Sequence, residues 1–279
     1  MKNFSFAGGH YWRKFSIQRI YWGIVFMVVF LIAPSMAIAE KVKAGGTLRF
    51  GTENEFAGFE VLKFNSRLAI NGSIAANTIM EPLFRLDSDD NLIPVLGLNA
   101  VISEDGKAWT ITLREGVTFH DGSLFNADAV VHHWQRIFDP QNKFRGRAAL
   151  SVIEAVEKIN DSTIRFRLKH PWLPFKQVIS SSRSLVNLIP SPKAVEEGIQ
   201  ARHPVGTGPF KFKEWRSGDR FVVEKNPNYW QKNKPFLDQI EFLPMPDHQT
   251  RYASLVSGQL DIIWTDRGNN INKAEQDAS

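Results

Sequence analysis

Residues 205–210 read Val-Gly-Thr-Gly-Pro-Phe, and this stretch decides between two kinds of fold. Two glycines around a threonine could form a loop that binds phosphate, or a turn where two backbone segments cross closely. A Walker A phosphate loop requires Lys and then Ser or Thr after its last glycine, followed by a helix. Here Pro209 and the alternating run Phe-Lys-Phe-Lys follow instead. We therefore predict a tight backbone crossing that leads into a β-strand.

The sequence after this stretch continues mainly as strands. Strand patterns cover residues 205–215, 219–226, 237–245 and 259–264, the last of them predicted as buried. Residues 248–258 are predicted as a short amphipathic helix, with Tyr252, Leu255 and Val256 facing inward and Gly258 as its C-cap.

The sequence before this stretch interleaves strands with helices. Strand patterns lie at residues 47–51, 108–114 and 163–169. Helices are predicted within residues 69–84, closed by Pro82, and after Asn126, which suits a helix N-cap. The combination predicts an α/β fold with mixed sheets.

The N-terminus has the features of a secretory signal. Residues 1–19 contain Lys or Arg at four positions and no acid, residues 20–33 are apolar, and residues 37–39 read Ala-Ile-Ala. A positive start, a short apolar segment and a small-residue exit are typical of a cleavable signal peptide. We predict a signal peptide over residues 1–39 with cleavage after Ala39, and the alternative is an uncleaved membrane anchor.

Composition limits the kinds of partner. Four of the 34 Lys and Arg residues lie in residues 1–39, which leaves 30 against 29 Asp and Glu in the mature chain. A nearly neutral mature chain does not indicate a nucleic-acid partner. The absence of cysteine excludes a disulfide framework, a thiolate metal site and a cysteine nucleophile.

We find no pattern for catalysis or for a metal site. His132 and His133 are adjacent, so they point about 100° apart on a helix and cannot easily share a metal ion. His120 with Asp121 is interpreted as a turn before the helix. The serines lack a G-x-S-x-G elbow. We therefore expect no catalytic residue, no metal ligand and no cofactor.

Several stretches together resemble the family 5 extracellular solute-binding proteins. The strongest match is residues 109–140, WTITLREGVTFHDGSLFNADAVVHHWQRIFDP, although Ala129 interrupts the family's A-x-D-V pattern. Residues 205–230, VGTGPFKFKEWRSGDRFVVEKNPNYW, and residues 251–263, RYASLVSGQLDII, are also similar to family motifs. The resemblance runs in order from about residue 45 to 265.

The resemblance implies a two-lobe fold of the type II periplasmic binding protein kind. It implies that residues 40–265 form the first lobe with an inserted subdomain, and that residues 266–279 begin the crossover to a second lobe. Family members are longer than this chain, so we expect an N-terminal fragment that cannot close on a ligand by itself. The implied function is the periplasmic solute-binding component of an ABC importer, which delivers peptides or peptide-like solutes to a membrane permease.

The resemblance also suggests ligand-binding residues. Thr52, Glu53, Asn54 and Glu55 follow the first strand, at an end that faces the cleft in this architecture. Arg183 falls where nickel-binding relatives place an arginine near the ligand.

Three alternatives remain open. The protein could bind a nickel chelate or another small solute, act as a secreted hydrolase that would need a residue such as Ser181 or His120, or be a single-pass anchored sensor. We expect a monomer without catalytic activity. Trp172 and Trp264 fall outside the regular patterns and are candidates to line a cleft, although core packing is the preferred interpretation for each.

Overall fold

The computed structural model describes residues 44–63, 69–180, 185–265, 268 and 271. These residues belong to one compact unit, Val42–Ser279, and the predicted signal peptide over residues 1–39 lies outside them. The strands are β1 Thr47–Thr52, β2 Phe84–Leu86, β3 Leu92–Pro94, β4 Gly97–Ile102, β5 Ala108–Leu113, β6 Ile153–Asn160, β7 Thr163–Leu168, β8 Phe210–Arg216, β9 Arg220–Lys225, β10 Gln239–Pro244 and β11 Ile262–Ile263. The helices are α1 Ala69–Ile79, α2 Ala127–Phe138, α3 Phe175–Ile179, α4 Pro192–Glu196 and α5 His248–Val256, with short 3-10 turns η1 Val61–Lys63, η3 Pro140–Asn142, η4 Arg145–Leu150 and η5 Leu185–Asn187.

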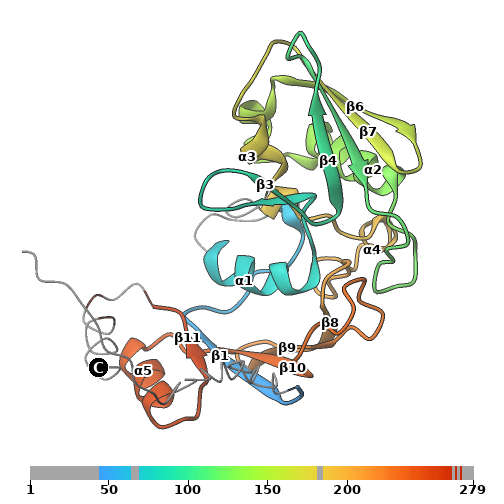
Figure 1. Cartoon of the computed structure of the whole chain (residues 1–279). Helices are drawn as coiled ribbons and strands as arrows, with labels where there is room; N and C mark the ends of the chain where they lie inside the picture. Colours follow the sequence, from blue (N-terminus) through green and yellow to red (C-terminus); the bar gives the residue numbers. More distant parts are fainter. Residues whose placement is uncertain (1–43, 64–68, 181–184, 266–267, 269–270, 272–279) are drawn as a thin grey trace, which may run out of the picture. The chain divides into compact units, whose positions relative to one another are not determined.

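A five-stranded mixed sheet joins the two ends of the described chain (Figure 1). Its strand order is β11-β1-β10-β9-β8. Strand β1 pairs in parallel with both β10 and β11, whereas β10, β9 and β8 pair antiparallel. The register places Thr47 opposite Gln239, so residues far apart in the sequence form the centre of the sheet. The predicted mixed sheet is confirmed.

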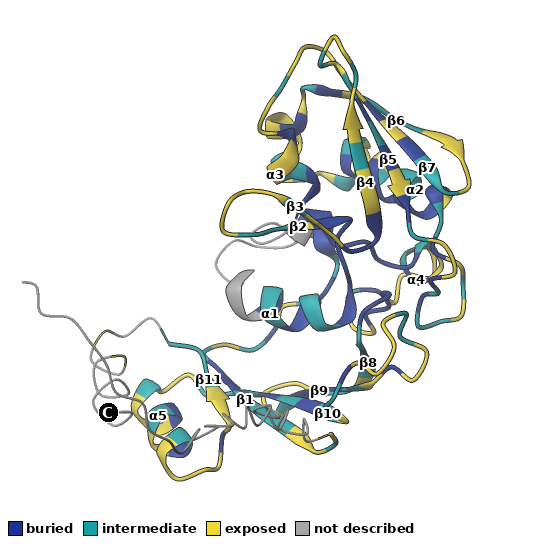
Figure 2. Cartoon of the chain, viewed as in Figure 1, coloured by how far each residue is buried: buried dark blue, intermediate teal, exposed yellow. Residues whose placement is uncertain are grey.

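A second sheet is built entirely from residues between β1 and β8. Its four strands are antiparallel in the order β4-β5-β7-β6. Apolar residues alternate along β5 and β7, and these residues are buried as the sequence predicted: Trp109, Ile111, Leu113, Ile164, Phe166 and Leu168. Figure 2 shows the buried stripes of these two strands beside α2. Helix α2 starts at the predicted N-cap, because the Asn126 side chain accepts a hydrogen bond from the Ala129 amide at 3.1 Å.

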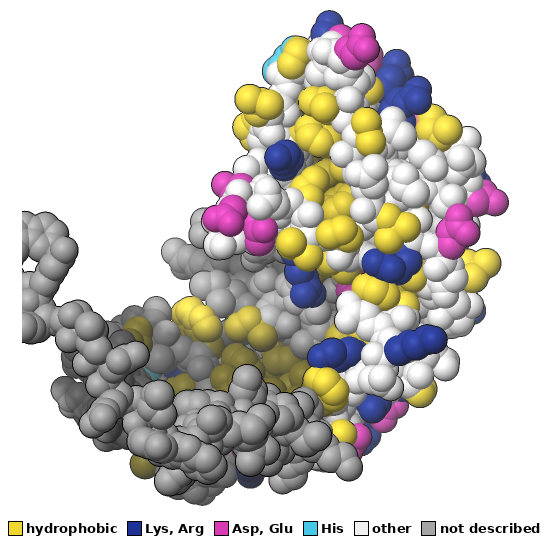
Figure 3. Space-filling view, in the orientation of Figure 1, with side chains coloured by type: hydrophobic (Ala, Val, Ile, Leu, Met, Phe, Trp, Pro, Cys, Tyr) yellow, Lys and Arg dark blue, Asp and Glu magenta, His cyan; other side chains and the backbone are white. Residues whose placement is uncertain are grey.

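Some apolar side chains of this second region remain exposed. Leu98, Val101 and Ile102 on edge strand β4 are 42%, 56% and 43% exposed, and Leu173 before α3 is 83% exposed. Figure 3 shows hydrophobic side chains gathered on the face formed by β3, β4 and α3. Exposed apolar surface of this kind favours association with other molecules.

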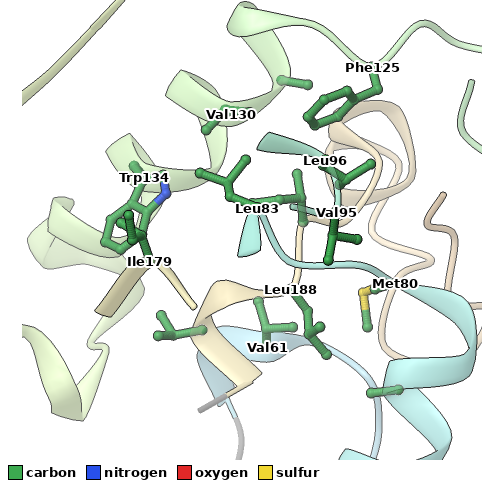
Figure 4. Close-up of a cluster of buried hydrophobic side chains, with 14 of the residues drawn as sticks. Val61, Met80, Leu83, Val95, Leu96, Phe125, Val130, Trp134, Ile179 and Leu188 are labelled. Atoms are coloured by element: carbon green, nitrogen blue, oxygen red, sulfur yellow. The ribbon is translucent and has the colours of Figure 1, made fainter. Parts of the chain in front are cut away.

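The hydrophobic core lies where the end of α1, helix α2 and the segments around β2 and η5 meet. Figure 4 shows this cluster, in which every labelled side chain is buried: Val61, Met80, Leu83, Val95, Leu96, Phe125, Val130, Trp134, Ile179 and Leu188. Burying a side chain of this size contributes about 1.5–3 kcal/mol, so the cluster holds segments of the chain that are distant in sequence.

The glycines of the Val-Gly-Thr-Gly-Pro-Phe stretch permit a close backbone crossing with the end of α1. A Cβ atom on Gly206 would lie 2.3 Å from the Ile79 carbonyl oxygen, and one on Gly208 would lie 2.7 Å from the same atom. The Gly208 amide donates a hydrogen bond to that oxygen at 2.8 Å. The predicted tight crossing that leads into strand β8 is confirmed.

His120 also stabilises this crossing, through hydrogen bonds to the backbone of both glycines. Its Nε2 lies 3.0 Å from the Gly208 carbonyl oxygen, and the Gly206 amide donates to its Nδ1 at 3.4 Å. These two partners suit a neutral ring that carries its proton on Nε2. Burial lowers the pKa of His120 to about 4, so the ring is neutral in the folded protein.

A buried carboxylate ties this region to the segment after β9. Glu81 is 1% exposed. It accepts hydrogen bonds from the Thr207 hydroxyl at 2.9 Å, the Tyr229 hydroxyl at 2.7 Å and the Trp230 ring nitrogen at 2.9 Å. Burial raises the pKa of Glu81, and the three donors act against that rise.

Helix α1 ends at Ile79, three residues before Pro82, as the sequence predicted. The Ile79 carbonyl accepts a hydrogen bond from the Gly208 amide where the crossing begins. One sequence-based expectation about a helix was wrong. Helix α5 does not bury Val256, which is 66% exposed, and it buries Arg251 and Ser254 instead.

The last strand also differs from its prediction. β11 contains only two residues and pairs with β1 alone among the described strands. Ile262 is 43% exposed there, because an edge strand has a neighbour on one side only.

Replacing Gly206 with Ala is expected to destabilise the protein by about 3 kcal/mol, because the new methyl group would overlap the backbone at Ile79. Chemical denaturation would measure the change. Gly268→Ala is the matched control, since no described residue lies within 4 Å of a Cβ atom there. Equal stability of both variants would contradict the close crossing.

Stability is expected to fall as the pH drops from about 6.5 towards 4. The pKa values of His120 and His133 are both lowered to about 4 by burial, so in this window only the unfolded chain binds protons at these rings. Protonation of each ring in the unfolded chain lowers the free energy of unfolding by up to about 3 kcal/mol. Denaturation curves at several pH values would measure how steeply the free energy of unfolding depends on pH. The His120→Gln variant should show a weaker dependence. An unchanged slope in that variant would contradict the role of His120.

Candidate functional site

Three parallel strands end together at one edge of the five-stranded sheet. Strand β1 lies between β10 and β11, with Thr52 opposite Pro244 and Gly51 opposite Ile263. Because the three strands run in the same direction, their carboxyl ends meet at this edge. In open α/β sheets, ligands bind outside the carboxyl ends of the parallel strands. They bind at the point where the strand order reverses, so that one strand has parallel neighbours on both sides. This edge is the candidate site, and we call it the β1 edge.

Thr52 shapes the β1 edge from within. Its side chain is fully buried, and its hydroxyl donates a hydrogen bond to the Asn54 carbonyl at 3.1 Å. Its own carbonyl accepts a hydrogen bond from the Met245 amide at 2.7 Å. Thr52 therefore fixes the turn that follows β1 and joins it to the end of β10.

Glu55 is held against strand β8. One of its carboxylate oxygens accepts a hydrogen bond from the Trp215 ring nitrogen at 3.2 Å. The guanidinium of Arg202 covers the Trp215 ring at 3.5 Å, which adds a cation–π contact. Glu55 therefore anchors the far end of the four-residue segment.

Glu53 and Asn54 lie between these two anchors. Glu53 is half-buried and Asn54 is exposed, and both also have contacts within the chain. A carboxylate and an amide oxygen at a strand end can accept hydrogen bonds from ammonium or amide groups of a ligand. The structure thus brings the four predicted residues to one edge, whereas the predicted Arg183 lies outside the described residues.

Arg251 is a feature of the β1 edge that the sequence reasoning missed. It is 0% exposed, on helix α5, and its guanidinium donates to backbone carbonyls next to the ends of β10 and β11. The helical pattern of residues 248–258 favoured the apolar residues as the inward face. The available signal was an arginine followed three residues later by a small polar Ser254, both of which are buried.

Trp264 borders the β1 edge as well. Its amide donates a hydrogen bond to the Gly51 carbonyl at 3.2 Å, and its side chain is half-buried. Trp172, the other candidate to line a cleft, packs instead against the hydrophobic core.

The histidines that could have suggested catalysis or metal binding have separate partners. His133 Nε2 lies 2.6 Å from the Val186 carbonyl oxygen, and His132 lies 3.7 Å from Glu196. Both ring nitrogens of His120 face backbone groups. Within the described ranges, no group of three or more His, Cys, Asp or Glu residues could hold a metal ion.

The described helices are all too short or too polar to cross a lipid bilayer.

Residues 91–279 match the model of the bacterial extracellular solute-binding proteins, family 5 Middle. A similar relative is a glutathione-binding protein, GsiB, of Pectobacterium atrosepticum, which is 37% identical over 191 residues. That alignment covers 68% of this chain and 37% of the relative, so the chain spans well under half of the relative's length.

Solved structures of periplasmic binding proteins have a similar fold. DppA of Helicobacter pylori in complex with the peptide STSA has a TM-score of 0.73 and 25% identity. The match covers 84% of this chain and 49% of the DppA chain. AgaA of A. tumefaciens R10 in complex with agropinic acid has a TM-score of 0.71 and 29% identity. The match covers 78% of this chain and 43% of the AgaA chain. The predicted fold class, that of periplasmic binding proteins with mixed α/β sheets, is confirmed.

Proposed function

Because the chain belongs to the family 5 bacterial extracellular solute-binding proteins, we propose that it is the solute-binding component of an ABC importer. It binds a small peptide-like solute at the β1 edge and delivers this solute to a membrane permease. The observation that carries the proposal is the common carboxyl edge of β10, β1 and β11, which presents Glu53 and Asn54.

The chemistry of this edge suits a solute with hydrogen-bond donors. Glu53 supplies a carboxylate and Asn54 an amide, and the half-buried Trp264 supplies an apolar wall. Binding sites for small molecules combine apolar walls with a few placed polar groups. Peptide-like solutes carry both an ammonium group and amide N–H groups. Similarity to a glutathione-binding protein and to a structure with a bound peptide supports this class of solute.

The family consists of solute-binding proteins rather than enzymes, and its members are periplasmic or extracellular. For this chain we propose a periplasmic location after removal of residues 1–39, a monomeric state, and an inner-membrane ABC permease as the protein partner. Residues 40–265 are proposed to form the first lobe of the binding domain, with an inserted subdomain, and residues 266–279 the start of a crossover to a second lobe. Arg183 stays a proposed ligand contact, in addition to the residues of the segment Thr52–Glu55.

We expect glutathione or a short peptide to bind the protein purified from its host. Isothermal titration calorimetry with glutathione, the dipeptide Met-Leu and the nickel–histidine complex would measure the affinities. Glu53→Gln should weaken binding about tenfold through the loss of a charged acceptor. Glu104→Gln makes the same chemical change at an exposed position in the turn between β4 and β5 and should leave binding unchanged.

Two results of this titration would count against the proposal. Binding of the nickel–histidine complex alone would favour the nickel-chelate alternative. Equal affinities of the Glu53→Gln variant and the unaltered protein would remove the β1 edge as the binding site.

Export and cleavage are expected from residues 1–39. The intact mass of the protein from the periplasm of its host should correspond to an N-terminus at Glu40. A reporter enzyme that is active only outside the cytoplasm should become active when it is fused to these residues. A membrane-bound protein that retains residues 1–39 would support the anchored-sensor alternative instead.

A further inference from the structure

Arg251 is a buried cation without a described acidic partner. Its side chain is 0% exposed, and the hydrogen bonds of its guanidinium to described residues all go to backbone carbonyl oxygens. Its Nη2 atom is buried and has no hydrogen-bond partner within the described part of the chain. Burying a charge is costly unless it is well compensated. Among the residues that the structure describes, pairing with an acid therefore does not explain Arg251.

The side chain of Arg251 lies across β1, the middle strand of the β1 edge. An ideal Cβ atom on Gly51 would lie 3.2 Å from Cγ of Arg251, so the arginine stem lies over β1 where that strand has no side chain. Beyond this point, Nε donates to the Trp264 carbonyl at 3.1 Å and Nη1 donates to the Met245 carbonyl. One guanidinium thus reaches the chain leaving β11 and the chain leaving β10.

The backbone amide and the backbone carbonyl of Met245 are both hydrogen-bonded, and the same holds for Trp264. The Met245 amide donates to the Thr52 carbonyl at 2.7 Å, and the Trp264 amide donates to the Gly51 carbonyl at 3.2 Å. Their carbonyls accept hydrogen bonds from Arg251. Strand β1 therefore fixes one side of each residue, and the guanidinium fixes the other side. The segment with Glu53 and Asn54 leaves β1 between these two fixed points.

We propose that Arg251 is the positioning residue of the ligand-binding edge. It holds the exits of β10 and β11 at a set spacing around the exit of β1, so that Glu53, Asn54 and Trp264 keep the geometry that binds the solute. This inference rests on the proposed function, because it assigns a task in solute binding. The planar fork of arginine is required, since a lysine ammonium is a compact group that cannot reach both carbonyls in this way.

Two measurements on Arg251→Lys test the proposal. In the absence of ligand, hydrogen exchange should become about tenfold faster at the amides of Met245 and Trp264, through the loss of one charge-assisted hydrogen bond at each residue. The amide of Val223 on β9 should exchange as in the unaltered protein. Glutathione should bind about tenfold more weakly, while the melting temperature stays within a few degrees.

Val256→Ala is the control, because Val256 lies on the same helix and is 66% exposed. It should change neither exchange nor affinity. If Arg251→Lys fails to fold, Gly51→Ala replaces it. The three atoms nearest to the added methyl group belong to the side chains of Leu260, Arg251 and Ile263, at 2.6, 3.2 and 3.2 Å. The methyl group crowds the arginine stem and keeps the charge, and the same local increase in exchange is expected to a smaller extent.

The two measurements separate failure of the positioning role from failure of the proposed function. Unchanged exchange at Met245 and Trp264, or faster exchange at Val223 to the same extent, would overturn the positioning role. Faster local exchange with unchanged glutathione affinity would also overturn it. If the unaltered protein binds no glutathione, a short peptide that it does bind takes that place. If it binds neither, the proposed function fails, and the role of Arg251 in solute binding is overturned with it, whatever the exchange result.

Discussion

The buried carboxylate of Glu81 is the interaction on which the rest of this structure depends. Its three donors come from Thr207 in the close crossing and from Tyr229 and Trp230 after β9. One side chain thus fastens the segments on both sides of the β8–β9 hairpin to the end of α1. Burial raises the pKa of Glu81, and the three donors act against that rise. Removing one donor leaves a buried carboxylate oxygen with fewer partners, which costs more than a single hydrogen bond contributes.

The contacts around Glu81 also help to position the strands of the five-stranded sheet. Strand β1 must pair with β10 across nearly the whole described chain, and closing so long a connection costs conformational entropy. The crossing of Gly206 and Gly208 over Ile79 returns the chain to β8 at a fixed place. The β8–β9 hairpin then presents β9 to β10, and β10 pairs with β1. The geometry of the β1 edge is therefore set by contacts that lie well away from it in the sequence.

At the β1 edge itself, the polar groups divide into two sets. Glu53 and Asn54 lie at least partly towards solvent, where they can meet a solute, whereas Thr52 and Arg251 are fully buried and bind backbone groups. A binding site needs both sets, because exposed acceptors are selective only if the segment that carries them is held in place. The exposed apolar residues of β4 belong to the other sheet, and exposed Leu173 lies between β7 and α3, so neither takes part in this arrangement.

The sequence by itself determined several of the local elements and the family. Alternation predicted β5 and β7, Asn126 predicted the start of α2, and the two glycines predicted a close crossing, because these signals depend on neighbouring residues. The segment Thr52–Glu55 was predicted only through the family resemblance. The sequence could not show that Glu81 would gather Thr207, Tyr229 and Trp230, or that α5 would bury Arg251 instead of Val256. Those outcomes depend on which distant backbone groups come within hydrogen-bonding distance, and only the tertiary structure decides that.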